Sequence, residues 1–148
     1  MFNNIVVGFD GSTPSENALR MACYLANTSA AAIHVAHTPR RDTVGFALGV
    51  MADSYIAANL PTPEEITTAA DKIFAQAKAV AAEAGVAQVT THQGNGDPAR
   101  DILACIAATD AELVVLGRRG LGSLRALVMG STSSDVTHLA TCACLTVA

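Results

Sequence analysis

Residues 111–120 read AELVVLGRRG, and a Gly–Ser pair follows at 130–131 after nine further residues. The largely apolar residues 112–116 are typical of a strand that is buried on both faces. Because glycine has no Cβ, the backbone N–H groups at Gly117 and Gly120 can approach an anion closely. The later pair starts a predicted helix, whose first N–H groups and dipole favour negative charge. The segment therefore predicts a strand, a loop and a helix that together can hold phosphate.

Strands and helices alternate along the rest of the chain. Strands are predicted at residues 4–9, 31–37, 86–93, 112–116 and 144–147, and helices at 12–27, 64–84, 99–109 and 131–139. Apolar strands that alternate with helices indicate a parallel sheet with helices on both faces. Right-handed crossovers place the carboxyl ends of all strands at one edge, where ligands bind in such folds. We therefore expect one α/β domain over residues 1–148, with Asp10, Val35 and Gly117 close to that edge.

Three local features complete this prediction. Gly85 is expected to cap the end of the second helix. The strand at 86–93 is more polar than the others and is expected near an edge of the sheet. Residues 38–63 form a long connection without a predicted element, and such connections are usually functional or flexible. Its apolar part, residues 44–60, would form a lid or pack across a subunit boundary.

The composition argues against several classes of protein. Hydrophobic residues make up 51% of the 148 residues and charged residues 15%, so we expect a folded core rather than disorder. A net charge of −4 argues against nucleic-acid binding. The N-terminus lacks the basic start and apolar run of a signal peptide, and residues 44–60 are short for a membrane span. We therefore expect a cytoplasmic protein that binds neither nucleic acid nor membrane.

The cysteines and histidines favour structural roles. Cys23, Cys105, Cys142 and Cys144 form no CxxC pair and are expected to be buried free thiols. The four histidines have no metal-ligand spacing of the HxxxH type, so the sequence predicts no metal site.

The glycine pattern, with its aspartate, resembles a known family. Gly117-x-x-Gly120-x9-Gly130-Ser131, with Asp10 after the first strand, is similar to the motif of the universal stress protein family. The resemblance covers nearly the whole chain, from the IVVGFDGS opening at residues 5–12 to the terminal strand. It implies a Rossmann-like fold of the adenine nucleotide alpha hydrolase type, with a five-stranded parallel sheet in the order 3-2-1-4-5.

The resemblance also implies which residues bind an adenine nucleotide. By this resemblance Asp10 would contact the nucleoside, Val35 would offer its backbone to adenine, and Gly117 would lie by the ribose. The expected binding residues are Phe9, Asp10, Val35, Gly117, Arg118, Gly120, Gly130, Ser131, Thr132 and Ser133. The chemistry agrees, because a carboxylate accepts from ribose hydroxyls and a serine hydroxyl donates to phosphate. The side chains of Arg118 and Arg119 could equally well contact a phosphate or lie in solvent.

The implied function is that of a stress-response regulatory protein that binds ATP, or AMP or ADP, with Mg²⁺ accompanying the triphosphate. The resemblance further implies a homodimer and leaves room for an unidentified protein partner. One departure concerns the dimer, because Ala143 stands where the family usually has proline before the terminal strand. Two alternatives stay open: slow ATP hydrolysis or phosphoryl transfer at the same site, and a nucleotide-free dimeric interaction module. The GxxxxGK[ST] motif of P-loop NTPases does not occur, which favours binding over hydrolysis.

Overall fold

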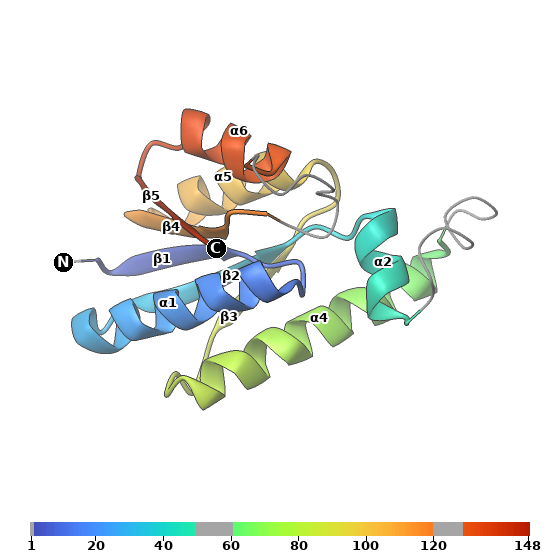
Figure 1. The fold of residues 1–148 in the computed structure, drawn as a ribbon, viewed down its shortest axis with the longest axis horizontal. Coiled ribbons are helices and arrows are strands. Elements are labelled where there is room, and N and C mark those ends of the chain that lie inside the picture. Colours follow the sequence, from blue (N-terminus) through green and yellow to red (C-terminus); the bar gives the residue numbers. More distant parts are fainter. Residues whose placement is uncertain (1, 50–60, 120–128) are drawn as a thin grey trace.

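The computed structural model describes residues 2–49, 61–119 and 129–148, which form a five-stranded parallel sheet covered by helices (Figure 1). The strands are β1 (Asn4–Gly8), β2 (Ala32–His37), β3 (Thr90–Gln93), β4 (Leu113–Gly117) and β5 (Ala143–Val147). The helices are α1 (Thr13–Ser29), α2 (Arg41–Ala47), α4 (Pro63–Glu83), α5 (Pro98–Thr109) and α6 (Ser131–Leu139). The spatial order β3-β2-β1-β4-β5 confirms the predicted order. No helix in these described residues is long and apolar enough to cross a membrane.

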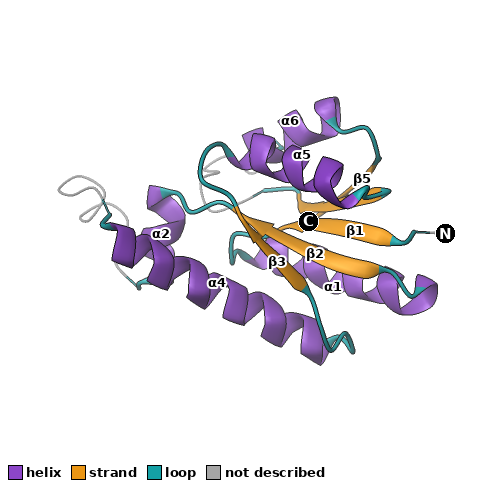
Figure 2. Ribbon diagram, turned by 180° about the vertical axis from the view of Figure 1, so that it is seen from behind, coloured by secondary structure: helices purple, strands orange, loops and turns teal. Residues whose placement is uncertain are grey.

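The two faces of the sheet carry different helices. α1 and α4 cover one face, and α5 and α6 cover the other, as Figure 2 shows from behind. Successive side chains of a strand point to opposite faces. Ile5 and Val7 of β1 therefore pack in the layer of α1 and α4, whereas Val6 packs in the layer of α5 and α6. All three are fully buried, which explains why the central strands are apolar without alternation.

The prediction that residues 38–63 contain no element is wrong for their first part. Arg41–Ala47 forms α2, which packs against α4. Val44 is 1% exposed, so its burial stabilises the short helix although Gly45 lowers the local helix propensity. Residues 50–60, which carry most of the predicted lid or interface segment, lie outside the described residues.

The second correction concerns β3. This strand begins at Thr90 rather than at residue 86, and it pairs with β2 alone. An edge strand gains ladder hydrogen bonds on one side only, and β3 buries none of its four side chains fully. Its edge position confirms the prediction. Gly85, with φ of +86°, follows α4 in the left-handed conformation expected of a glycine at a helix end.

The terminal strand β5 forms the opposite edge of the sheet. The N–H of Ala143 donates to the carbonyl of Glu112 at 3.1 Å, a bond that the proline usual at this position could not make. Cys142 and Cys144 are only partly buried, so the prediction of buried thiols is wrong for this pair. The reason is the edge position, because only one neighbouring strand, β4, covers β5.

The carboxylate of Glu112 joins the start of β4 to the chain before β1. It accepts hydrogen bonds from the backbone N–H groups of Asn3 at 2.8 Å and Asn4 at 2.9 Å, and from the Asn3 amide at 2.7 Å. These bonds lower the pKa of Glu112 from 4.5 to about 2. A carboxyl whose pKa is lower in the folded than in the unfolded protein stabilises the fold at pH values above its unfolded-state pKa. This contribution is lost as the pH falls towards its folded-state pKa.

Replacing Glu112 with glutamine should therefore flatten the acid side of the stability profile. Between pH 4.5 and 2.5 the free energy of unfolding of the wild type should fall more steeply than that of Glu112→Gln, because only the wild type must protonate this carboxylate. Urea unfolding at a series of pH values measures the difference. Asp71→Asn, at an exposed position on α4, is the control, and parallel curves for Glu112→Gln and the wild type would contradict the assignment.

Candidate functional site

The carboxyl ends of β1 and β4 bring Asp10 and Gly117, two of the predicted binding residues, to one edge of the sheet. Asp10 follows β1, Gly117 ends β4, and α2 follows β2 on the same side of the molecule (Figure 1). Val35 lies two residues before β2 ends, opposite Val7 of β1 and Thr91 of β3. The rim of β2 at this edge is therefore formed by the residues after Val35.

Asp10 holds the turn that connects β1 to α1. Its Oδ1 accepts hydrogen bonds from the backbone N–H of Ser12 at 3.0 Å and from the Ser12 hydroxyl at 2.5 Å. Ser12 is in turn the N-cap of α1, and Gly11 between them has φ of +81°, a conformation that favours glycine. The turn thus fixes a carboxylate at the N-terminal end of a helix, where negative charge is stabilised.

Gly117 brings the end of β4 against the first turn of α1. A Cβ built on Gly117 would lie 2.8 Å from the carbonyl carbon of Pro14 and 2.9 Å from the backbone nitrogen of Ser15. Both atoms belong to the backbone, so no side-chain rotation relieves the clash. The Ser15 hydroxyl also lies 3.4 Å from the Asp10 backbone nitrogen, which donates to it. Asp10 and Gly117, far apart in sequence, are therefore held together by one helical turn.

The start of α6 reaches the same place. The buried hydroxyl of Ser133 donates to the carbonyl of Gly117 at 2.7 Å, so this serine positions the end of β4. Gly130 is the N-cap of α6 and has no side chain to accept from the first N–H groups, whereas α1, α4 and α5 have capping side chains at Ser12, Thr62 and Asp97. Ser131 is exposed and Thr132 is half-buried. The uncapped first turn of α6 therefore offers donors to an anion.

The two arginines after β4 differ in their surroundings. The N–H of Arg118 donates to the carbonyl of Val147 at 2.6 Å, and its side chain is exposed. The Nε of Arg119 is buried and has no hydrogen-bond partner among the described residues. A buried guanidinium nitrogen normally has an acceptor, so this one suits a bound anion. The residues expected to bind the nucleotide included Arg118 and not Arg119, and Gly120, also expected there, lies outside the described residues.

His37 is a residue of this edge that sequence reasoning missed. It is 3% exposed, and its Nδ1 lies 2.8 Å from the carbonyl oxygen of Phe9, to which it donates. Burial lowers the pKa of His37, and the bond to Phe9 and the nearby Asp10 carboxylate oppose this shift. The ring packs edge-on against Phe74 of α4, with centroids 5.8 Å apart. Phe9, predicted in the site, is thus buried at 3% exposure with its carbonyl already bound.

The loop after β3 closes the edge beside β2. The N–H of Gly94 donates to the carbonyl of His37 at 2.8 Å. The carboxylate of Asp101 accepts from the Thr38 hydroxyl at 2.7 Å and from the N–H of Gly96 at 3.2 Å. These bonds fix the exit of β2, from which α2 continues.

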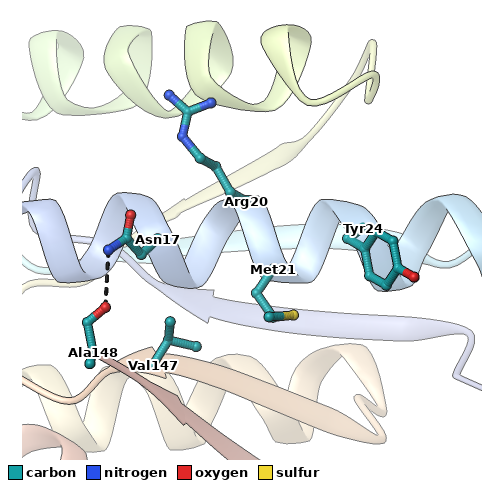
Figure 3. Close-up of a pocket in the computed structure, with 6 residues that line it drawn as sticks. All are labelled: Asn17, Arg20, Met21, Tyr24, Val147 and Ala148. Atoms are coloured by element: carbon teal, nitrogen blue, oxygen red, sulfur yellow. Dashed lines mark hydrogen bonds between the residues drawn. The ribbon is translucent and has the colours of Figure 1, made fainter.

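Two other features lie outside this group of residues, although Val147, which lines the first of them, pairs with Gly117. A shallow hollow of about 510 Å³ lies between α1 and the end of β5, lined by Asn17, Arg20, Met21, Tyr24, Val147 and Ala148 (Figure 3). On the sheet, the Nδ1 of His34 lies 3.1 Å from the Nε2 of His92. Burial and the proximity of His92 lower the pKa of His34. Among the described residues, no three metal-ligating side chains gather at one place.

Comparison with known proteins identifies the family. The model of the universal stress protein family matches residues 1–148. The chain is 34% identical to Universal stress protein YxiE of Bacillus subtilis (strain 168), over 99% of both chains. It resembles a universal stress protein solved in complex with cAMP (TM-score 0.72, 22% identity, 99% of this chain and 97% of that chain). It also resembles the universal stress protein of Archaeoglobus fulgidus in complex with dAMP (TM-score 0.69, 21% identity, 99% and 98%). By sequence and by fold, this chain belongs to the universal stress protein family.

Proposed function

We propose that this chain is a cytoplasmic, stress-related regulatory protein that binds an adenine nucleotide at the carboxyl edge of its sheet. The observation that carries the proposal is the contact of three segments there. Gly117 of β4 meets the first turn of α1, which holds Asp10, and Ser133 of α6 bonds to Gly117. The cAMP and dAMP bound by two structural relatives support an adenine nucleotide as the ligand.

Each part of this edge suits one part of the ligand. The Asp10 carboxylate would accept from the ribose hydroxyls. The first N–H groups of α6 and the guanidinium of Arg119 would bind the phosphates. Gly130 gives α6 no capping side chain, and the Arg119 Nε has no hydrogen-bond partner among the described residues. Since these donors can hold one, two or three phosphates, AMP, ADP and ATP all fit, and Mg²⁺ would accompany ATP.

Calorimetric titration tests the proposal. We expect ATP to release or absorb heat on binding to the wild type with a micromolar dissociation constant, measurable at about 100 μM protein. Arg119→Gln should bind ATP about tenfold or more weakly, because a charge-assisted hydrogen bond contributes about 1.5–3 kcal/mol. The neighbouring Arg118, which the resemblance placed among the binding residues, has an exposed side chain, so Arg118→Gln should change the affinity much less. Absence of binding to ATP, ADP and AMP alike would refute the proposal.

The hollow between α1 and β5 supports a homodimer as the assembled form. Met21 and Tyr24 are 40% and 67% exposed; Met21 lies near Val147 at the edge of the sheet, and Tyr24 lies further along α1 in the same hollow (Figure 3). An apolar hollow beside an edge strand is a favourable surface for a second copy of the chain.

We expect Met21→Glu to shift the protein from dimer towards monomer, because the charge would have to be buried at the interface. Light scattering at several protein concentrations measures the mass. Leu139→Glu, at an exposed apolar position of α6, is the control and should stay dimeric. A Met21→Glu protein with the wild-type dimer mass would place the interface elsewhere.

A further inference from the structure

A nucleotide that uses the proposed phosphate donors must place its base on the opposite side of Asp10. The sheet order is β2-β1-β4, and α6 follows β4. Asp10 follows the middle strand of these three, and the ribose lies between base and phosphates in any nucleotide. With phosphates at α6 and ribose at Asp10, the base must lie towards β2 and the helix that follows it, α2.

α2 carries an exposed aromatic side chain on that side. Its buried side is formed by Thr43 and Val44, which are 4% and 1% exposed. Phe46, by contrast, is 50% exposed, although it is among the largest apolar side chains of the protein. Half of the Phe46 side chain is exposed to solvent beside the proposed ligand site. A bound ligand could bury this apolar surface, which would be favourable.

The ring of Phe46 lies at the turn that holds Asp10. Its Cε1 is 3.4 Å from the position of a Cβ built on Gly11, the residue after Asp10. The turn itself is fixed from α4, because the Gln76 amide donates to the carbonyl of Gly11 at 3.3 Å and to the Glu16 carboxylate at 2.6 Å. The aromatic edge thus lies against the residue that directly follows the proposed ribose acceptor, on a turn that α4 holds in place.

We propose that Phe46 packs against the base of the bound nucleotide and so gives this site its requirement for a nucleoside rather than a bare polyphosphate. The inference rests on the proposed adenine-nucleotide function. Aromatic side chains pack on the π-faces of nucleobases, and a purine offers the larger face. Phe46 would contact only the base, and α6 and Arg119 would bind the phosphates.

Affinity measurements on Phe46 variants test this role. Phe46→Ala should weaken binding about 5- to 150-fold, the range that loss of one base–aromatic contact produces. The factor should be the same for ATP and AMP, because the lost contact involves no phosphate. Phe46→Tyr keeps the ring and should bind within about threefold of the wild type. Leu139→Ala removes another exposed apolar side chain, far along α6, and should bind as the wild type does.

The outcomes separate the two claims. If the wild type binds no adenine nucleotide, the proposed function fails and the role of Phe46 fails with it. If the wild type binds ATP and Phe46→Ala binds equally well, the role of Phe46 is wrong and the proposed function stands. A loss in Phe46→Tyr as large as in Phe46→Ala would also overturn the proposal, since it would point to a disturbed turn. A loss for ATP that exceeds that for AMP would overturn it too, since it would point to a disturbed phosphate site instead of a lost contact with the base.

Discussion

Replacing Asp10 with alanine is expected to weaken ATP binding about 10- to 150-fold, the effect of losing about 1.5–3 kcal/mol of hydrogen bonding to a charged acceptor. The carboxylate stands at the end of β1 and is oriented by the N–H and hydroxyl of Ser12. A fixed carboxylate can accept from ribose hydroxyls without first being ordered, which is why its loss should be costly. Calorimetric titration with ATP measures the change.

A comparison of ligands shows whether the effect is a direct contact. The wild type should bind ATP more tightly than 2′,3′-dideoxy-ATP. Asp10→Ala should lose most of this preference, because the ribose hydroxyls then have no carboxylate to which they can donate. Asp71→Ala is the control: it removes an exposed carboxylate of α4 that does not belong to this turn, so the preference should remain. Equal discrimination by the wild type and Asp10→Ala would exclude Asp10 as the ribose acceptor.

Gly117→Ala should lower the free energy of unfolding by about 1–3 kcal/mol, the usual cost of overpacking. The added methyl group would lie 2.8 Å from the Pro14 carbonyl carbon, so the backbone of β4 or of α1 must shift. Each kcal/mol lowers the midpoint of thermal unfolding by roughly 2–4 °C for a domain of this size. Nucleotide affinity should fall too, because the displaced turn also holds Asp10.

The control for this substitution is another glycine. A Cβ on Gly96 would meet no atom within 4 Å, so Gly96→Ala should change the free energy of unfolding by less than about 0.5 kcal/mol. Differential scanning calorimetry of the three proteins gives the comparison. Identical unfolding temperatures for Gly117→Ala and the wild type would mean that β4 and α1 are not in the close contact described.

The sequence predicted the parallel sheet because its signals are local, whereas the strand order was implied by the resemblance to the family. Apolar runs such as Val6–Val7 and Val114–Val115, each followed by glycine and a helix start, identify buried parallel strands. The sequence did not predict an element that depends on tertiary contacts. α2 contains Gly45 and is stabilised by packing on α4, and no propensity reveals such a contact.

The candidate site was predicted unevenly for the same reason. Asp10 and Gly117 follow strands directly, so their convergence follows from a parallel sheet alone. Val35 is inside β2, two residues before the strand ends at His37, although the sequence predicted that end correctly; its role came from the resemblance and not from the strand pattern. The unpaired Arg119 Nε and the exposed Phe46 become visible only when burial is known.

An NMR titration of isotope-labelled protein with ATP tests the central claim most directly, because it reports where the ligand binds as well as whether it binds. The largest shifts should occur at the backbone amides of Gly11, Gly117, Arg119 and Ser131, which belong to three segments separated in sequence and meet at one edge of the sheet. The amides of Met21 and Tyr24, in the hollow between α1 and β5, should move much less. Shifts centred on that hollow, or no saturable shifts at all, would contradict the account.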